Sequence, residues 1–253
     1  MMDPQTKAKL IEINQNFYNQ FAHSFSATRN QVQPGVQRLI QNVKPGAAIL
    51  DVGCGNGTLA RALAAQGFAG HYLGVDMSAG LLEKAELLLK DPPSGSYDFL
   101  WIDLASPGWQ NSIAQPSNDW LVSFAVLHHL PGEDLRQGIV KAFSQLIAPH
   151  GFVAVSVWQW QNSPRLRKRV LPWSTVGLNP EDLDQGDVLL DWRASDSPGL
   201  RYVHTFSEDS LSALAAQGGF RVNRSFHADG KSGDLALYQV WQLDQESKQP
   251  EID

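Results

Sequence analysis

The chain has 253 residues, of which 43% are hydrophobic, and a formal net charge of −6 at pH 7. These values suit one globular domain, and they exclude a protein coated in basic surface for nucleic acid, although not a local basic patch. No signal peptide and no stretch of roughly 18 apolar residues is recognisable, so we expect a cytoplasmic protein outside the membrane. Cys54 is the only cysteine, which excludes an intrachain disulfide and a multi-cysteine metal site, and we expect no bound metal.

Two helices are predicted at the start of the chain. The first covers residues 5–22, because Leu10, Phe17 and Phe21 lie on one face of an amphipathic helix. The second covers residues 34–43 and begins with a proline.

Strands and helices then alternate along the chain. Strands are predicted over residues 48–52, 71–75, 99–102, 120–124 and 152–158. Helices are predicted between them over residues 58–66, 79–90 and 134–147. This alternation predicts a mostly parallel sheet with helices on both faces, which binds its ligand at the carboxyl ends of the strands.

The regular alternation ends at Trp158. A helix over 207–217 and two strands over 220–226 and 235–242 are predicted to close the sheet as an antiparallel edge hairpin. We expect one domain over residues 1–243 and a flexible tail over 244–253. Its parts are a helical cap (1–46), a cofactor-binding core (47–158), a substrate-side insertion (159–200) and the closing helix and strands (201–243).

A glycine-rich turn follows the first strand of the core. Gly53, Gly55 and Gly57 alternate in Asp-Val-Gly-Cys-Gly-Asn-Gly, and an alanine- and leucine-rich helix follows them. Glycine amides and the positive end of a helix favour a nucleotide-type cofactor there. Cys54, between two of the glycines, is interpreted as a small residue under the cofactor rather than as a nucleophile.

The details of the turn narrow the choice of cofactor. The turn lacks the lysine and hydroxyl of an ATP or GTP loop, and its third glycine comes one residue early for a dinucleotide. Asp51 beside the turn suits a ligand with a positive amino group, such as S-adenosylmethionine. Asp76 follows Gly57 by about 20 residues, where a ribose carboxylate is expected.

Residues 48–157 resemble the class I S-adenosylmethionine-dependent methyltransferases. The resemblance rests on the glycine turn, Gly-Val-Asp-Met-Ser at 74–78, Ile-Asp-Leu at 102–104 and Val-Leu-His-His-Leu at 126–130. It implies the Rossmann-like methyltransferase fold, with the glycines on the methionine part, Asp76 on the ribose, and Met77, Asp103 and the Leu104 amide on the adenine. The predicted cofactor-binding residues are Tyr18, Arg29, Asp51, Gly53, Cys54, Gly55, Gly57, Asp76, Met77, Asp103, Leu104 and Phe124.

The outer segments resemble a narrower family, the tRNA wobble-uridine carboxymethyl methyltransferases. The similar segments are 18–29, 186–192 and 201–206. The resemblance implies esterification of 5-carboxymethyluridine in the anticodon loop, and work with a small activator protein. The chain departs from the family at Asp191, where proline is usual, and in the closing segment 229–238.

A carboxylate acceptor is ionised near neutral pH and needs a cation rather than a general base. Arg29 and Arg201 are the candidates to bind it, with Tyr202 beside Arg201, because arginine can clamp an acid with two hydrogen bonds. Arg29 suits the carboxylate of the cofactor equally well, and either arginine could instead form a structural ion pair. Tyr18 is interpreted as a lid over the cofactor. The predicted catalytic residues are Arg201, His128 and His204, although histidines such as His128 and His129 are as often packing residues.

Arg165, Arg167, Lys168 and Arg169 form a basic cluster that suits contacts with RNA phosphates. A solvated helix face is the alternative. The leading hypothesis is therefore methylation of a carboxymethyl-modified uridine in tRNA. The rivals are a small-molecule methyltransferase acting on an acid, hydroxyl or amine, and a non-catalytic binding module that retains the fold.

Overall fold

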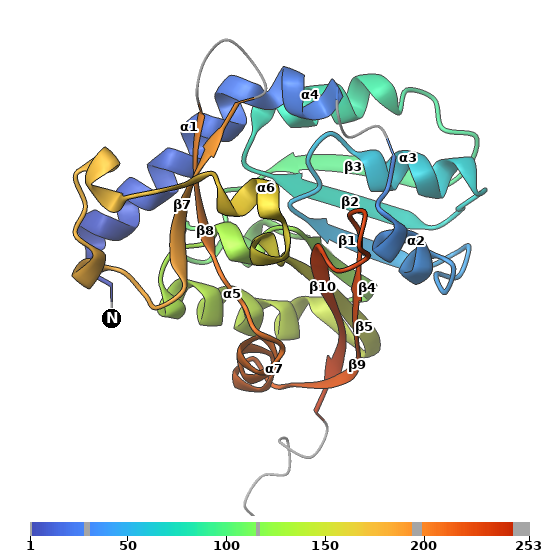
Figure 1. Ribbon diagram of the computed structural model, residues 1–253. Coiled ribbons are helices and arrows are strands. Elements are labelled where there is room, and N and C mark those ends of the chain that lie inside the picture. Colours follow the sequence, from blue (N-terminus) through green and yellow to red (C-terminus); the bar gives the residue numbers. More distant parts are fainter. Residues whose placement is uncertain (1, 28–30, 115–116, 194–198, 245–253) are drawn as a thin grey trace, which may run out of the picture.

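The computed structural model describes residues 2–27, 31–114, 117–193 and 199–244 (Figure 1). Its main sheet has seven strands in the order β3-β2-β1-β4-β5-β10-β9. The strands are β1 (Ala48–Val52), β2 (His71–Asp76), β3 (Ser96–Trp101), β4 (Asn118–Phe124), β5 (Ile147–Trp158), β9 (Phe220–Ala228) and β10 (Ala236–Leu243). The first five pair in parallel, whereas β10 runs antiparallel to both β5 and β9. The predicted parallel sheet and its antiparallel edge hairpin are confirmed.

Helices cover both faces of this sheet, because its central strands are apolar on both faces. On one face, Ile49 packs in a core with residues of α2 (Pro34–Ile40) and α3 (Thr58–Ala65). On the other face, Leu50 packs in a core with residues of α5 (Glu133–Leu146) and α7 (Glu208–Gln217). Helix α4 (Ala79–Leu88) lies against β2 and β3.

Helix α1 (Pro4–Ala27) is longer than the predicted 5–22. Asp3 caps its start, since one carboxylate oxygen accepts hydrogen bonds from the amides of Gln5 and Thr6. After Pro4 no proline or glycine interrupts the helix, so no residue of either kind ends it at 22.

The insertion forms a second, antiparallel sheet, which the sequence pattern did not predict. Its strands are β6 (Val170–Leu171), β7 (Asp187–Trp192) and β8 (Gly199–His204). Short helical turns are η1 (Trp109–Ser112), η2 (Leu127–His129), η3 (Trp160–Asn162), α6 (Pro164–Arg167), η4 (Trp173–Val176) and η5 (Pro180–Asp182). The predicted insertion ends at residue 200, but β8 continues past this boundary. The second sheet therefore includes residues of both the insertion and the closing segment.

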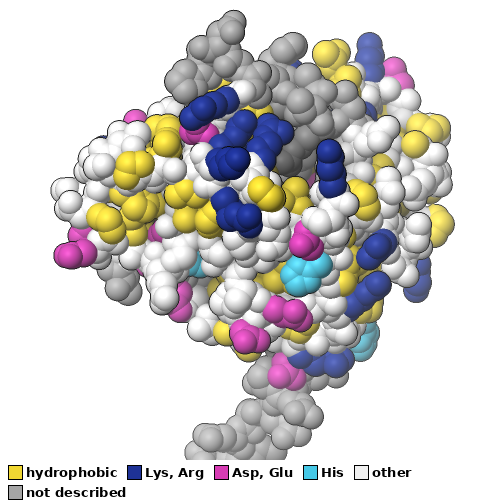
Figure 2. Space-filling model, viewed as in Figure 1, with side chains coloured by type: hydrophobic (Ala, Val, Ile, Leu, Met, Phe, Trp, Pro, Cys, Tyr) yellow, Lys and Arg dark blue, Asp and Glu magenta, His cyan; other side chains and the backbone are white. Residues whose placement is uncertain are grey.

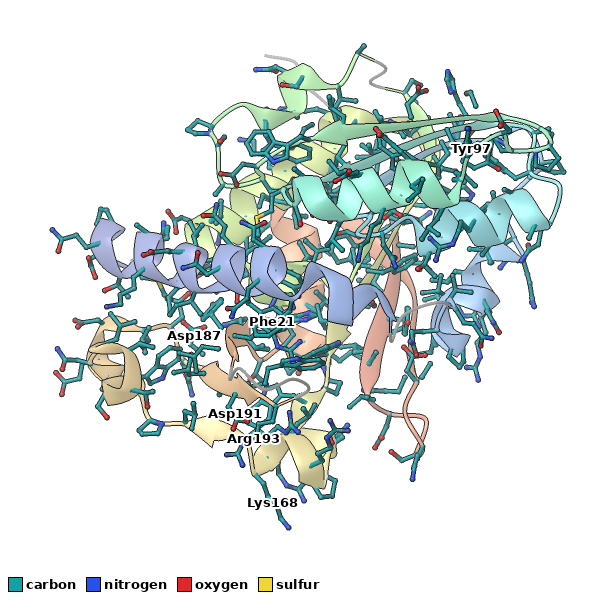
Figure 3. All side chains as sticks on the ribbon, turned by 90° about the horizontal axis from the view of Figure 1, so that it is seen from above. Phe21, Tyr97, Lys168, Asp187, Asp191 and Arg193 are labelled. Carbon is teal, nitrogen blue, oxygen red and sulfur yellow. The ribbon has the colours of Figure 1, made fainter. Side chains whose placement is uncertain are left out.

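Helix α1 lies between the two sheets in Figure 3 and contacts both β8 and α4. Leu10 is fully buried in a small core with Met2 and Tyr202. The Asn14 side chain adds two hydrogen bonds to the backbone of Tyr202, one at 2.9 Å to its amide and one at 3.2 Å to its carbonyl. The cap helix is therefore fixed to the insertion sheet by apolar and polar contacts. Within the described ranges, no helix has the length and apolar content of a membrane span.

Candidate active site

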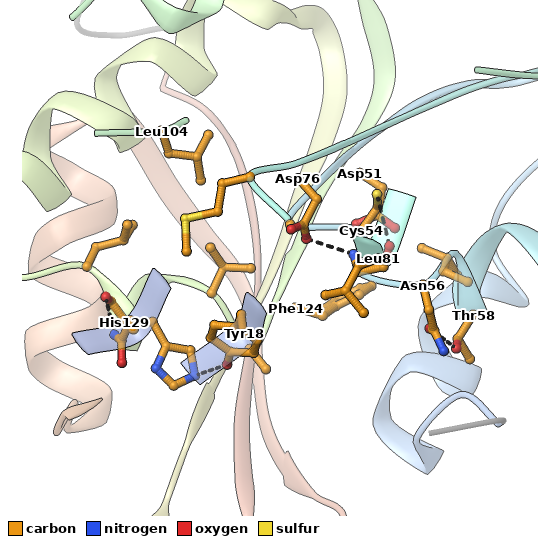
Figure 4. A pocket seen from close by; sticks show the side chains of 18 of the residues that line it. Tyr18, Asp51, Cys54, Asn56, Thr58, Asp76, Leu81, Leu104, Phe124 and His129 are labelled. Atoms are coloured by element: carbon orange, nitrogen blue, oxygen red, sulfur yellow. Dashed lines mark hydrogen bonds between the residues drawn. The ribbon is translucent and has the colours of Figure 1, made fainter. Parts of the chain in front are cut away.

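A cavity opens where the carboxyl ends of β1, β2 and β4 meet the cap helix (Figure 4). It brings together residues that are far apart in the sequence, as expected for parallel strands that end at one edge of a sheet. The predicted cofactor residues that line it are Tyr18, Asp51, Gly53, Cys54, Gly55, Asp76, Met77, Asp103, Leu104 and Phe124. Gly57 does not line it, and Arg29 lies outside the described residues.

Glycine is required at the three positions of the turn for different structural reasons. All have positive φ, at 82°, 57° and 68°, a conformation that favours glycine. A Cβ on Gly53 would lie 2.2 Å from Val126 Cγ2, and one on Gly57 would lie 2.9 Å from the Cβ of Ala85 in α4. A Cβ on Gly55 would have no atom within 4 Å. Gly55 thus leaves open space on the cavity side, whereas Gly53 and Gly57 allow close packing of the protein itself.

Asp76 connects the end of β2 to the glycine turn. One carboxylate oxygen accepts a hydrogen bond from the Gly55 amide at 2.9 Å, and the other accepts one from the Ser78 amide at 2.9 Å. Desolvation raises the pKa of Asp76, and these two bonds partly offset that rise. A carboxylate can accept about four hydrogen bonds, so this side chain retains acceptor capacity for a ligand hydroxyl.

Asp51 is a buried carboxyl group at the wall of the cavity, with only 3% of its surface exposed. The Tyr72 hydroxyl donates a hydrogen bond to it at 2.5 Å. Desolvation, together with the nearby charge of Asp76, raises the pKa of Asp51 to about 7. A cation beside Asp51 would favour the ionised form and lower that pKa.

Cys54 is buried under the same turn. Desolvation and the charges of Asp76 and Asp51 raise the pKa of its thiol well above the usual value. The thiol is therefore protonated near neutral pH, which supports the interpretation of Cys54 as a packing residue.

Residues at the ends of β2 and β3 line another part of the cavity. Met77 and Leu104 line it, and the Met77 carbonyl accepts a hydrogen bond from the Trp101 indole at 2.7 Å. Asp103 accepts a bond from the Ala105 amide at 2.9 Å, which fixes the loop after β3. Met77, Asp103 and Leu104 thus line the cavity, and their contacts with adenine stay a prediction.

Tyr18 and His129 form a hydrogen-bonded pair on the wall formed by α1 and η2 (Figure 4). The Tyr18 hydroxyl lies 2.8 Å from His129 Nε2, and His129 Nδ1 lies 3.0 Å from the Tyr202 carbonyl oxygen. A carbonyl oxygen only accepts, so Nδ1 carries a proton, and in the neutral ring Nε2 accepts from Tyr18. Asn14, which also lines the cavity, donates to the His129 carbonyl oxygen at 2.9 Å.

Sequence reasoning did not assign Asn14 and His129 to the site. A signal for Asn14 exists, since Asn14 and Tyr18 are four residues apart and therefore share a face of α1. No such signal separates His129 from His128, because only the η2 turn decides which ring faces the cavity.

His128 is fully buried and does not line the cavity. Its ring stacks on Trp158 with 5.3 Å between centroids, and its Nδ1 accepts a hydrogen bond from the Trp158 amide at 3.3 Å. The structure thus places His128 in the core behind His129, and its catalytic role stays a prediction without a contact to the cavity.

Arg201 is 1% exposed and does not line the cavity either. Its guanidinium carbon lies 4.6 to 4.7 Å from the ring centroids of Phe17, Trp158 and Trp192. These rings come from α1, β5 and β7, and their faces attract the cation. Arg201 therefore joins the cap, the core and the insertion at this point.

Tyr202 and His204 belong to a polar cluster away from the cavity. The Tyr202 hydroxyl donates to Asp187 at 2.8 Å, and His204 Nδ1 lies 2.7 Å from the same carboxylate oxygen. Arg136 donates to the Leu130 carbonyl and forms an ion pair with Asp184 at 2.8 Å. Burial raises the pKa of Tyr202 well above its usual value. The cluster holds β7 and β8 against α5, and no side chain of Tyr202 or His204 lines the cavity.

The predicted basic cluster lies on the surface of the insertion, where Figure 2 shows Lys and Arg side chains gathered over α6. Three of its residues line a surface hollow together with Pro164 and Arg193, namely Arg165, Lys168 and Arg169. Arg167 instead donates to the Gln161 carbonyl at 2.7 Å. Arg193 was not predicted as part of this cluster, because it is distant in sequence.

No metal site emerges among the described residues, since none of their His, Cys, Asp and Glu side chains form a group of three suited to a metal ion. The strand order, the glycine turn and the strand-end acids around one cavity define a Rossmann-like protein of the class I methyltransferase type.

A family model described as a methyltransferase domain matches residues 24–225, and the chain belongs to this family, whose members use S-adenosylmethionine. Solved structures agree on the fold. A S-adenosylmethionine-dependent methyltransferase from Methanosarcina mazei superposes with a TM-score of 0.63 at 19% identity, covering 85% of this chain and 100% of that one. The magnesium protoporphyrin IX methyltransferase from Synechocystis, solved with bound S-adenosylmethionine, has a TM-score of 0.57 at 16% identity, covering 93% and 97%.

Two similar curated proteins are named as tRNA (carboxymethyluridine(34)-5-O)-methyltransferases. The one from Arabidopsis thaliana is 29% identical over 157 residues, which are 61% of this chain and 34% of that protein. The one from Saccharomyces cerevisiae is 27% identical over 159 residues, which are 61% of this chain and 50% of that protein. The matched part is thus a third to a half of the length of these relatives.

Proposed function

We propose that this protein transfers the methyl group of S-adenosylmethionine to a carboxymethyl group on the wobble uridine of tRNA. The observation that carries the methyl-transfer part is the cavity, in which Asp51, Asp76 and the open side of Gly55 meet. The tRNA part is supported by the names of the similar proteins and by the basic cluster on an otherwise acidic chain.

The residues of the cavity fit the cofactor. Asp51 would hold its ammonium group, Asp76 would accept from its ribose hydroxyls, and Met77 with Leu104 would contact the adenine. Gly55 leaves room for the methionine part, where any other residue would place a Cβ. The bound cofactor supplies an electrophilic methyl group on a sulfonium sulfur.

On the acceptor side, the chain has to orient an oxygen in line with that methyl group and keep water out. Tyr18, His129 and Asn14 are the polar side chains at this wall, and α1 covers it. An ionised carboxylate needs no proton acceptor. None of the described residues lining the cavity is Lys or Arg, so Arg29, outside the described residues, is the leading proposed cation for the carboxylate. Arg201 is the alternative of the sequence analysis, but it is buried among three rings and does not line the cavity.

The decisive experiment is incubation of the protein with labelled S-adenosylmethionine and total tRNA, followed by nucleoside mass spectrometry. We expect a labelled methyl ester of 5-carboxymethyluridine. Label in another nucleoside, or none in tRNA with label in a small molecule of a cell extract, would contradict the proposed acceptor. The same reaction with and without extract tests the proposed need for a small activator protein, because the purified chain alone would then be inactive.

A small-molecule O-methyltransferase is the second candidate, and the lining of the cavity favours it. His129 accepts a hydrogen bond from Tyr18 at Nε2, so an acceptor hydroxyl that donates to the Tyr18 oxygen could lose its proton to Tyr18 while Tyr18 passes its own proton to Nε2. A carboxylate acceptor does not require this transfer. A search of small hydroxy and carboxylic acids with the same labelled cofactor separates the two candidates. Binding of the cofactor without transfer to any acceptor would instead favour the non-catalytic module.

A further inference from the structure

The surface hollow of the insertion is a second site with a chemistry of its own. It is lined by Arg165, Lys168, Arg169, Arg193 and Pro164. We propose that this hollow binds backbone phosphates of RNA, and that Asp191 is a positioning residue that orients two of its arginines. The inference rests on the proposed function, because it takes the substrate to be RNA.

The local charge is opposite to that of the whole chain, which carries −6. Arg165 and Lys168 are exposed, and the Arg193 side chain is 71% exposed, so water and ligands reach the hollow. Within the described part of the chain, Asp191 is the only acid that forms an ion pair with any of the four cations. The hollow therefore keeps a net positive charge, which favours phosphate.

Asp191 lies beneath this surface and is 6% exposed. One of its carboxylate oxygens forms an ion pair with Nε of Arg193, and the other lies 4.0 Å from Nε of Arg169. Figure 3 shows Asp191, Arg193 and Lys168 on the same side of the insertion sheet. Because Asp191 faces the Nε atoms, these contacts leave the terminal nitrogens of both guanidinium groups for a ligand, with the Arg193 side chain 71% exposed and the Arg169 side chain 14% exposed. Two such nitrogens match two phosphate oxygens.

The backbone of Asp191 also takes part in the pairing of the insertion strands. The Asp191 amide donates a hydrogen bond to the Arg169 carbonyl at 2.9 Å, which continues the pairing of β6 with β7 beyond Val170 and Leu190. A proline at position 191 would provide neither this amide proton nor the carboxylate.

The place of the hollow suits a polymer rather than a small anion. It is open at the surface of the insertion lobe, and β8 of the same lobe packs against α1 and η2, which line the cofactor cavity. We take an RNA with one nucleoside in the cavity to pass its phosphates over this lobe. The ligand class we assign is therefore the phosphodiester backbone.

The test measures binding of a short unmodified anticodon stem-loop RNA by fluorescence anisotropy at several salt concentrations, without cofactor. For Arg193→Gln and for Lys168→Gln, we expect about fivefold weaker binding and a salt slope lower by about 1. Arg221→Gln is the matched control, because Arg221 is an exposed arginine on β9 outside the hollow, and its slope should stay unchanged. Equal effects of all three substitutions would overturn the site.

Asp191→Asn tests the positioning role through the sign of its effect. It removes one negative charge, so simple attraction would strengthen RNA binding, whereas loss of orientation weakens it. We expect binding about threefold weaker despite the more positive net charge, and tighter binding would overturn the role of Asp191. If Asp191→Asn fails to fold, Arg169→Lys and Arg193→Lys serve instead, because lysine retains the charge without the planar guanidinium group that Asp191 orients. Unchanged RNA binding by both variants would overturn the positioning role of Asp191.

Uridine monophosphate serves as the probe for a small phosphate ligand. We expect it to bind far more weakly than the RNA, and equal affinity would overturn the assignment to an RNA backbone. This assay is independent of methyl transfer. If the wild type and the hollow variants bind RNA equally, the RNA site in the hollow is contradicted, even if the protein methylates tRNA. If the variants lose RNA binding but no methylated tRNA is found, only the proposed function is contradicted.

Discussion

The Tyr18 hydroxyl lies 2.8 Å from Nε2 of His129, and this contact joins the cap helix to the segment that follows β4. Asn14, one turn earlier in α1, bonds to the His129 carbonyl and to both backbone groups of Tyr202. One face of α1 thereby links the cofactor cavity to the insertion sheet. These side chains hold the cavity wall that we propose for the acceptor.

Tyr18→Phe should lower the rate of methyl transfer about tenfold and change cofactor affinity less than about threefold. It removes the bond to His129 but keeps the ring, so the cap is held less precisely over the acceptor. Rates with the identified acceptor and calorimetry with the cofactor measure the two effects. Tyr97→Phe is the control, because the Tyr97 hydroxyl bonds to the Phe68 carbonyl away from the cavity. A wild-type rate in Tyr18→Phe would show that this bond does not position the acceptor.

Cofactor affinity should fall as the pH drops below about 7, by up to tenfold per pH unit. The reason is that Asp51 has a pKa of about 7 in the free protein and must ionise to pair with the cofactor ammonium. Calorimetry between pH 5.5 and 8.5 measures this dependence. Asp51→Asn should bind the cofactor more weakly and should lose most of this pH dependence. A pH profile shared by both proteins would assign the dependence to another group.

The same substitution should have the opposite effect on stability. The pKa of Asp51 is raised above its unfolded value of 3.8, so its favourable contribution is complete below that value and disappears as the pH rises through about 7. Asp51→Asn should therefore melt at a higher temperature than the wild type at pH 8.5, by a few degrees (roughly 2–4 °C per kcal/mol), with a smaller difference at pH 5. Thermal unfolding without cofactor measures this, and a difference independent of pH would contradict it.

The glycine turn offers a matched pair of substitutions. Gly53→Ala places a Cβ 2.2 Å from Val126, whereas Gly55→Ala places one in open space beside the cavity. We expect Gly55→Ala to fold, with about 1–2 kcal/mol of left-handed strain, and to bind cofactor more than tenfold more weakly. Gly53→Ala should lose more stability than Gly55→Ala. Gly219→Ala, with φ of 82° and no atom within 4 Å of the added Cβ, shows the cost of strain alone. Cofactor affinity equal in Gly55→Ala and Gly219→Ala would contradict the placement of the methionine part.

Arg201→Lys distinguishes a structural arginine from an acceptor clamp. The three aromatic rings around the guanidinium predict a melting temperature lower by several degrees with cofactor affinity retained, since lysine keeps the charge but not the stacked plane. Thermal unfolding and methyl-transfer rates on the folded variant measure the two roles. An unchanged melting temperature with lost activity would instead support Arg201 as the clamp.

The residues proposed for the cofactor could be placed around one cavity from the sequence because their signals are local. Asp51 and Asp76 lie at the carboxyl ends of β1 and β2, and Asp103 follows β3. The ends of parallel strands meet at one edge of the sheet whatever the rest of the chain does. The glycine turn indicated close backbone packing, although the sequence did not distinguish Gly55, which faces open space, from Gly57, which packs on Ala85.

The side chains on the wall proposed for the acceptor could not be predicted from the sequence, because their positions depend on contacts between distant segments. His129 rather than His128 faces the cavity because of one helical turn, and Arg201 is enclosed by rings from three separate elements. Arg193 joins the basic hollow only because β7 pairs with β6. By itself, the sequence determined the sheet, the glycine turn and the class of cofactor, since short-range periodicity and turn chemistry specify them. Only the tertiary structure decided which side chains line the wall proposed for the acceptor, since packing of α1, η2 and the insertion brings them together.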